Sequence, residues 1–146
     1  MKLAWLLWLA SILPGHGQDQ VCLATTVYLE ARDQPVLGQT AVAEVVLRRR
    51  DSGRYGNGVC NVVMQHKQFA PAFTSGQFRI KNFKAWNRAW QVASDTLAMW
   101  MLPAAVRKQV APGADHFYAH NLVQPAWANG QTVAVIGGHS FVRVGL

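Results

Sequence analysis

One acidic residue, Glu30, lies in an apolar part of the sequence where its carboxyl group could act as a proton donor. It is the only acid in the segment Val21–Arg32, which is rich in Ala, Val, Tyr and Leu. A carboxyl group packed against apolar neighbours has a raised pKa and stays protonated near neutral pH. Such a group can protonate the leaving oxygen of a glycosidic bond. The alternative is a solvated helix residue that pairs with a nearby arginine.

The other acids offer no obvious partner for such a donor. Asp33 lies three residues further on and could share a helix face with it, but Asp33-Gln34-Pro35 has the composition of a turn. The pair of carboxyl groups that a two-carboxylate glycosidase needs is therefore not evident. Other acids have expected structural places: Glu44 on a helix surface, Asp51 and Asp95 in a turn and on a helix, and Asp115 as a turn cap before a strand.

Three histidines offer a different chemistry. His116 and His120 are four residues apart and lie on one face if their segment is extended. Together with His139 they could bind zinc, with Glu30 as the general base. The protein would then be a zinc-dependent amidase or peptidase of the cell wall. Because this spacing is generic, we prefer a reaction without a metal or other cofactor.

The composition limits the class of protein. The chain has 146 residues, 51% of them hydrophobic, which predicts a single folded domain and excludes a disordered chain. Its net charge of +7 indicates attraction to a polyanion, which could be nucleic acid, an anionic membrane surface or an anionic cell wall. The N-terminus decides among these partners, because nucleic-acid binding does not fit an exported protein.

The N-terminus has the pattern of an export signal. Met1-Lys2 is followed by the apolar stretch Leu3–Leu13 and by small residues at Gly15 and Gly17. We therefore expect a signal peptide or signal anchor over residues 1–17 and a catalytic domain over residues 18–146. A buried first helix is the alternative. The sequence has no apolar run of about 20 residues, so no ordinary membrane-spanning helix is expected.

The two cysteines, Cys22 and Cys60, both follow this leader. In an exported chain they could form one disulfide, which the chain-entropy model values at roughly 4 kcal/mol at best. The alternative is a pair of buried thiols in a reducing compartment. No Cys/His spacing typical of structural zinc is present.

Hydrophobic periodicity predicts helices first and a small sheet last, which defines an α+β fold. Asp19 is the expected N-cap of the first helix of this domain, and Asn57 that of a short third helix. On the fourth helix we expect one apolar side, formed by Phe83, Trp86, Trp90, Ala93 and Leu97. The predicted helices cover about 19–32, 37–50, a short segment after 57 and 82–101; the predicted strands cover 116–119, 132–136 and 140–144.

Four blocks of the sequence resemble the spore cortex-lytic enzyme and cell wall hydrolase family. The first block, Val21–Arg32, contains the Tyr-x-Glu-Ala-Arg signature, and Pro35–Leu47 is similar to the family's second helix. The third is VCNVVMQHKQFA, and the C-terminal block comprises GADHFYAH, PAWA and IGGHSFVRV. The blocks occur in the family's order and cover nearly the whole chain after the leader.

The resemblance implies a mainly helical, lysozyme-like fold with a small antiparallel sheet near the C-terminus, and cleavage of peptidoglycan glycan strands. The family's catalytic glutamate falls on Glu30. As in a lytic transglycosylase, Glu30 would protonate the bridging oxygen after muramic acid and then accept the proton of the sugar's 6-hydroxyl. One carboxyl group suffices for this reaction, which fits the missing second acid.

The resemblance also implies substrate contacts and shows two departures. The family's Gly-Glu after the signature is Asp33-Gln34 here, and its Asn-Arg after the second helix is Arg48-Arg49. A core position is the alternative for Phe69, and a structural histidine for His139. The predicted substrate-binding residues are Gln68 and Phe69, which match a Gln-Phe pair, Tyr118 and Trp127, which could stack on sugars, and His139 of a Gly-x-His motif.

These observations together predict an exported, monomeric enzyme of the periplasm or cell wall, which the N-terminal segment could tether transiently to the membrane. Its partners would be peptidoglycan glycan strands and, through charge, anionic cell-wall polymers. The alternative outside enzymology is a cationic protein that binds the wall or membrane through charge and aromatic insertion. That protein would keep its full lytic effect after Glu30→Gln.

Overall fold

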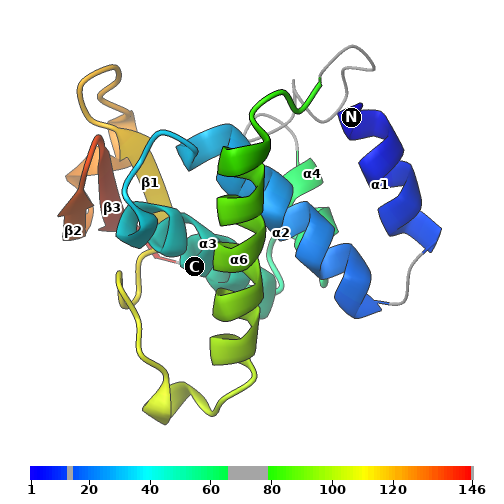
Figure 1. The fold of residues 1–146 in the computed structure, drawn as a ribbon. Helices are drawn as coiled ribbons and strands as arrows, with labels where there is room; N and C mark the ends of the chain where they lie inside the picture. The colour runs from blue at the N-terminus through cyan, green and yellow to red at the C-terminus, as the bar shows by residue number, and fades with distance from the viewer. Residues whose placement is uncertain (13–14, 66–78, 146) are drawn as a thin grey trace.

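The computed structural model describes residues 1–12, 15–65 and 79–145, and it shows helices gathered around one central helix, with a small sheet beside them (Figure 1). The central helix, α2, spans Gly15–Ala31 and contacts every other helix named here. Its inward side chains form the main core with apolar residues of α3, α4 and α6. The surrounding helices are α1 (Leu3–Ile12), α3 (Val36–Ser52), α4 (Val59–Met64) and α6 (Phe83–Trp100).

Helix α2 begins earlier than the sequence pattern predicts, and Asp19 is not its N-cap. Asp19 lies within the helix, and its carboxylate accepts a hydrogen bond of 3.3 Å from the backbone N–H of Val59. It therefore satisfies the start of α4, a helix 40 residues away, because a free N–H at a helix start needs an acceptor. Asn57 is not the cap of α4 either, since Gly58 precedes its first residue.

More residues of α3 are buried than the predicted inward side contains. Ala41, Val42 and Val45 are buried as predicted, but Glu44 is also only 1% exposed, so the expectation of a surface charge is wrong. The Glu44 carboxylate accepts hydrogen bonds from the backbone N–H groups of Val110 and Ala111, both at 2.8 Å. Burial raises the pKa of Glu44, and these hydrogen bonds oppose the shift. Glu44 thus anchors the segment that follows α6.

Helix α6 starts as predicted, and its predicted apolar side is buried in part: Trp86 and Ala93 are in the core, and Leu97 packs against it. The Asn82 side chain accepts a hydrogen bond from the N–H of Ala85 and so caps the helix. Phe83 and Trp90 of the predicted apolar side are 56% and 39% exposed. Because small residues let helices approach closely, the packed side is richer in alanine and valine than in aromatic rings. The buried residues are Ala85, Trp86, Ala89, Val92, Ala93, Thr96 and Trp100.

The C-terminal sheet confirms the predicted α+β fold. Its strands are β1 (His116–Ala119), β2 (Gln131–Ile136) and β3 (His139–Arg143), paired antiparallel in the order β1-β3-β2. The central strand β3 is buried over its first four residues, and Phe141 joins it to a second core shared with α2 and α3. This packing holds the ends of β1 and β3 close to the C-terminal end of α2.

Two further features bear on the predicted leader and on the cysteines. The expected cleavage point after Gly17 lies inside α2. Cys22 and Cys60 form a disulfide that joins α2 to α4, as predicted for an exported chain. Within the described ranges, no helix has both the length and the apolar character needed to cross a membrane.

Candidate active site

Glu30 lies in the last turn of α2, between two adjoining hollows of the surface. One hollow has a volume of about 570 Å³ and the other about 660 Å³. Glu30, Ala119 and His139 line both of them, so the two hollows form one open cleft with Glu30 in the middle. A polymer could therefore pass across Glu30 and occupy both sides.

The Glu30 carboxyl group is partly buried, and its surroundings in the described structure contain no counter-ion. Arg32, the nearest arginine in sequence, places its guanidinium 5.0 Å from the centre of the Tyr28 ring and donates a hydrogen bond to the Tyr28 carbonyl. Among the described residues, no side chain forms an ion pair or hydrogen bond with Glu30. Burial raises the pKa of Glu30 from 4.5 to about 7. The carboxyl group therefore retains its proton in part at neutral pH, as a general acid requires.

The smaller hollow is polar, and Gln34 shapes it. The Gln34 side-chain oxygen accepts a hydrogen bond of 2.8 Å from the backbone N–H of Gly138, in the turn between β2 and β3. Gly137 in the same turn has a φ of +56°, and a Cβ there would lie 2.4 Å from that oxygen. The turn therefore needs glycine, and Gln34 fixes it to the end of α2. The charged or polar lining residues are Glu30, Arg32, Asp33, Gln34, Asn121 and His139.

The larger hollow is aromatic. Tyr118 and Trp127 both line it, and their rings meet edge to face with centroids 5.6 Å apart. Behind them, the His116 ring lies 4.8 Å from the Trp127 ring, and its Nδ1 is 2.8 Å from the Asp115 carboxylate. Asp115 also accepts hydrogen bonds from the N–H groups of Val144 and Gly145, so it holds the segment after β3 rather than capping a turn. The two aromatic rings offer flat surfaces of the kind that stack on sugars.

His139 is more buried than a simple substrate contact requires. Its side chain is 7% exposed and packs against the rings of Phe117 and Phe141. Burial lowers the pKa of His139. Its Nδ1 is enclosed and has no hydrogen-bond partner in the described structure. The neutral imidazole therefore serves as part of the cleft wall beside Glu30.

The predicted three-histidine metal site does not assemble. His116 binds Asp115, whereas His120 Nδ1 lies 3.1 Å from the hydroxyl of Ser140 and His139 packs among aromatic rings. Among residues 1–12, 15–65 and 79–145, no three His, Cys, Asp or Glu side chains are placed to hold a metal ion. The zinc-dependent alternative thus has no support in this arrangement.

The structure therefore brings Glu30, Tyr118, Trp127 and His139 together in one cleft, whereas Gln68 and Phe69 lie outside the described residues. Sequence reasoning did not assign Arg32 or Asn121 to the site. Arg32 could have been found, because it belongs to the Tyr-x-Glu-Ala-Arg signature and is only two residues from Glu30. Asn121 carries no such signal, since only the fold brings the end of β1 to the end of α2.

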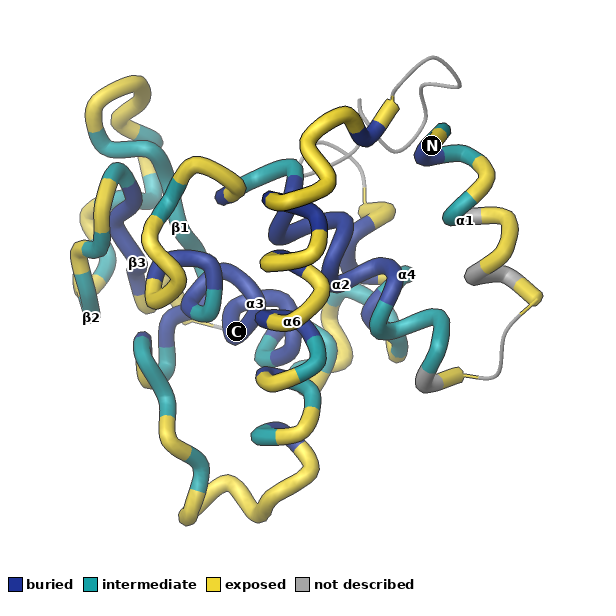
Figure 2. Tube along the Cα trace, viewed as in Figure 1, coloured by how far each residue is buried: buried dark blue, intermediate teal, exposed yellow. Residues whose placement is uncertain are grey.

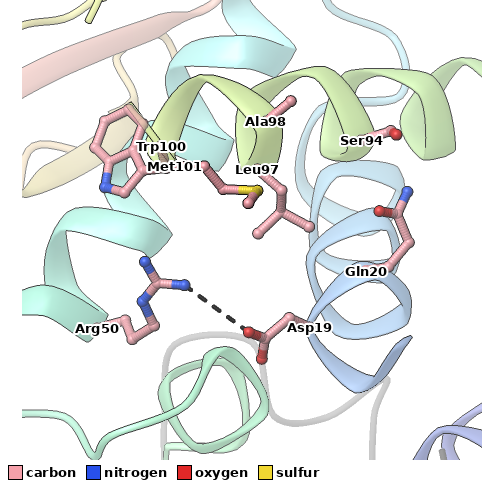
Figure 3. Close-up of a pocket in the computed structure, with 8 residues that line it drawn as sticks. All are labelled: Asp19, Gln20, Arg50, Ser94, Leu97, Ala98, Trp100 and Met101. Atoms are coloured by element: carbon pink, nitrogen blue, oxygen red, sulfur yellow. Dashed lines mark ion pairs between the residues drawn. The ribbon is translucent and has the colours of Figure 1, made fainter. Parts of the chain in front are cut away.

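A separate hollow of about 530 Å³ lies between α2, α3 and α6 (Figure 3). Arg50 and Asp19 form an ion pair of 3.8 Å across one side of it, and Leu97 and Met101 of α6 line the other (Figure 3). None of the predicted catalytic or substrate-binding residues lines this hollow. The cleft at Glu30 is therefore the candidate active site.

A mainly helical domain that holds one carboxyl group of raised pKa in an open, aromatic-lined cleft defines the class of lysozyme-like enzymes. A family model described as Cell Wall Hydrolase matches residues 33–142, which is most of the chain. The chain therefore belongs to the cell wall hydrolase family. The matched range begins just after Glu30, so the assignment of this residue rests on the cleft and on the signature around it.

Curated relatives and solved structures agree with this family. The chain is 41% identical over 64 residues to the spore cortex-lytic enzyme of Bacillus cereus, and 39% identical over 70 residues to that of Bacillus subtilis. These matches cover 43% and 47% of this chain, but only 24% and 23% of the relatives. The chain thus corresponds to about a quarter of each relative's length.

The fold matches two solved catalytic domains. One is that of the germination-specific lytic transglycosylase SleB from Bacillus anthracis, and the other that of SleB from Bacillus cereus. Both have a TM-score of 0.67 and 24% sequence identity, and the match covers 86% of this chain. It covers 93% and 91% of the two domains. The predicted lysozyme-like fold is thereby confirmed.

Proposed function

We propose that this protein cleaves the glycan strands of peptidoglycan as a lytic transglycosylase, with Glu30 as the proton donor and acceptor. The observation that carries the proposal is a single carboxyl group with a pKa of about 7 in the middle of an open cleft. The solved relative is named a lytic transglycosylase, and the curated relatives are named cortex-lytic enzymes.

The reaction would need one protein carboxyl group. Glu30 donates its proton to the oxygen that links muramic acid to the next sugar, and the bond from C1 to this oxygen breaks with the electron pair on the oxygen. The 6-hydroxyl of the same muramic acid then attacks C1, and its proton passes to the Glu30 carboxylate. The product is an anhydro sugar, and Glu30 is protonated again. No water enters the reaction, and no second acid is required.

The substrate contacts in this proposal follow the two halves of the cleft. Tyr118 and Trp127 would stack on sugar rings in the aromatic half, because aromatic faces pack well against the C–H groups of sugars. His139 would form the neutral wall beside the reacting carbon. Gln68 and Phe69 would contact the glycan as the family resemblance implies.

The decisive experiment is mass spectrometry of the fragments that the protein releases from purified walls. Wild type should release anhydro-muramic acid ends, and Glu30→Gln should lower the rate by roughly a hundredfold or more, because general acid catalysis contributes that much. Asp95→Asn, an exposed acid of α6, is the matched control and should keep full activity. Circular dichroism would verify that both variants fold.

Two results would contradict the proposal. Fragments with ordinary reducing ends would indicate hydrolysis by water. Full lysis by Glu30→Gln would instead favour a cationic protein that disrupts walls or membranes without catalysis.

We further propose that the enzyme works outside the cytoplasm as a monomer without a cofactor, with residues 1–17 as its export signal. The net charge of +7 would hold it near anionic wall polymers. N-terminal sequencing of the exported protein tests the signal, since removal after Gly17 gives a chain that begins at Gln18. A protein that retains Met1 in the periplasm or wall would show that the segment is an anchor or a first helix.

A further inference from the structure

Three exposed cations lie at the start of α6 or just before it. Lys81 precedes the helix by two residues, and Lys84 and Arg88 are four residues apart, which places these two on one side of the helix. Exposed residues recur along α6 in Figure 2. None of the three cations forms an ion pair with another described residue. The sequence contains no acid between Asp51 and Asp95.

This arrangement has a cost for the fold alone. Like charges one helical turn apart, such as Lys84 and Arg88, destabilise a helix by a few tenths of a kcal/mol. The first turn of α6 also contains no acid, although a carboxylate there would stabilise the helix dipole. The stability of α6 therefore does not account for the two cations Lys84 and Arg88.

Tyr28 connects the start of α6 with Arg32, a cation of the Glu30 cleft. Arg32 lines the polar half of that cleft, and its guanidinium lies over the Tyr28 ring. The Tyr28 hydroxyl oxygen in turn accepts a hydrogen bond of 3.4 Å from the backbone N–H of Asn82, the residue after Lys81. Figure 1 shows the start of α6 beside the last turns of α2. Arg32 and the cations at the start of α6 thus lie on two segments that meet at the Tyr28–Asn82 hydrogen bond. We call Arg32, Lys81, Lys84 and Arg88 together the cationic strip.

We propose that the cationic strip binds the carboxylates of the peptide attached to muramic acid, so that the enzyme selects glycan strands that still carry their peptides. This inference rests on the proposed function. It concerns the peptide attached to muramic acid, which would extend from the cleft along α6. Arginine is suited to it, because its planar guanidinium matches a carboxylate with two parallel hydrogen bonds.

The position of the strip favours this ligand over a free anionic polymer. The peptide is attached to muramic acid, the sugar at which the strand would be cut, so it must lie within a few ångströms of Glu30. A separate polymer is not attached to the sugar in the cleft, so nothing would bring it to Arg32 in particular. The length also fits: Lys84 and Arg88 are about 6 Å apart along α6, and an extended peptide of two residues covers about 7 Å.

Kinetics on two substrates would test the strip. The double variant Lys84→Gln/Arg88→Gln is compared with Lys108→Gln/Arg143→Gln, which removes the same charge at exposed positions outside the cleft. The substrates are soluble glycan strands with their peptides and the same strands after an amidase has removed them. The strip variant should raise KM roughly threefold to tenfold for the first substrate and leave the second unchanged, as expected for two solvent-exposed charge pairs. The control variant should change neither.

Binding to an inactive protein separates this inference from the proposed reaction. NMR titration of Glu30→Gln with a soluble muramyl tripeptide should shift signals of α6, and the added strip substitutions should abolish the shifts. If wild type forms no anhydro product but the tripeptide still binds in this way, the proposed reaction is wrong, whereas peptide binding by the cationic strip is supported. An equal rise of KM on both substrates in the strip variant would contradict peptide binding by the strip. So would a defect of this variant that is seen only on walls with phosphodiester polymers.

Discussion

At the scale of single residues, the candidate site depends on an acid that forms no ion pair with another described residue. Glu30 could have been neutralised by Arg32, but that guanidinium is turned to the Tyr28 ring and carbonyl. Burial is the cause of the raised pKa of Glu30. The protonated acid is thus obtained by directing a neighbouring arginine elsewhere.

This burial predicts a pH-dependent loss of stability that Glu30→Gln should remove. The pKa of Glu30 is about 7 in the folded protein and about 4.5 when unfolded, so the folded state binds the proton more tightly. Stability is therefore full below pH 4.5 and falls as pH rises to 7, by up to about 3 kcal/mol. Urea unfolding at pH 4.5 and pH 8 should show Glu30→Gln gaining stability over wild type at the higher pH only.

An equal difference between the two proteins at both pH values would contradict this linkage. Asp95→Asn serves again as the control, because that exposed acid should leave the pH dependence of wild type unchanged.

Some of these residue-scale features could be predicted from the sequence. Glu30 was identifiable because it is the only acid of its segment and part of the family signature, although Ala119 and His139 beside it in the cleft are distant in the sequence. Glu44 was not, because its partners Val110 and Ala111 are more than 60 residues away and present only backbone N–H groups. A periodic pattern indicates which side of a helix is apolar, but it carries no signal for a distant loop that needs an acceptor.

At the scale of elements, Glu44 joins α3 to the segment between α6 and β1. That segment contains the short helix Ala104–Val106 and has few buried apolar side chains, so it depends on polar anchors. Arg48 and Arg49 of α3 supply others, donating to the carbonyls of Ala114 and Asp115. One turn of α3 thereby fixes the start of the strand that leads into the cleft.

We expect Glu44→Ala to destabilise the protein by about 3 kcal/mol, because two buried N–H groups lose their acceptor. Thermal and urea unfolding measure the loss, and Glu44→Gln should recover part of it, since its amide oxygen can still accept. Asp95→Ala, an acid of similar size on the surface of α6, should change stability by no more than about 0.5 kcal/mol. If Glu44→Ala matched this control, the anchor would be unimportant.

Helix boundaries show the same limit of sequence reasoning. The start of α6 was predicted correctly, since Asn82 caps it through a local hydrogen bond. The start of α2 was not predicted correctly. Asp19, the expected N-cap, lies within α2 and accepts a hydrogen bond from the first residue of α4 instead. The apolar side of α6 was predicted correctly for Trp86 and Ala93 but not for Phe83 and Trp90, which are exposed, whereas Ala85, Ala89 and Val92 are buried.

At the scale of the whole molecule, charge and chemistry are separate. In the proposed reaction Glu30 is uncharged when it donates its proton, whereas the chain as a whole carries a net charge of +7. The molecule can therefore approach an anionic wall through long-range attraction without altering the reacting group.

Activity on intact walls should consequently fall as salt rises. The screening length shortens from about 10 Å at 0.1 M salt to about 3 Å at 1 M, which removes attraction between separated charges. Release of fragments from walls should decrease severalfold over this range, whereas the rate on short, peptide-free glycan strands should stay nearly constant. Insensitivity of wall digestion to salt would mean that the basic surface has another purpose.

The disulfide between Cys22 and Cys60 makes the stability of the protein depend on oxidation. It closes a loop of 38 residues between the helix that presents Glu30 and the helix α4, which the loop-entropy model values at about 4 kcal/mol. A freshly made chain with reduced thiols would lack this tie and would be prone to unfolding and proteolysis. Oxidation would thus act as a maturation step, and a cell that synthesises the protein would be shielded from it until the chain reaches an oxidising environment.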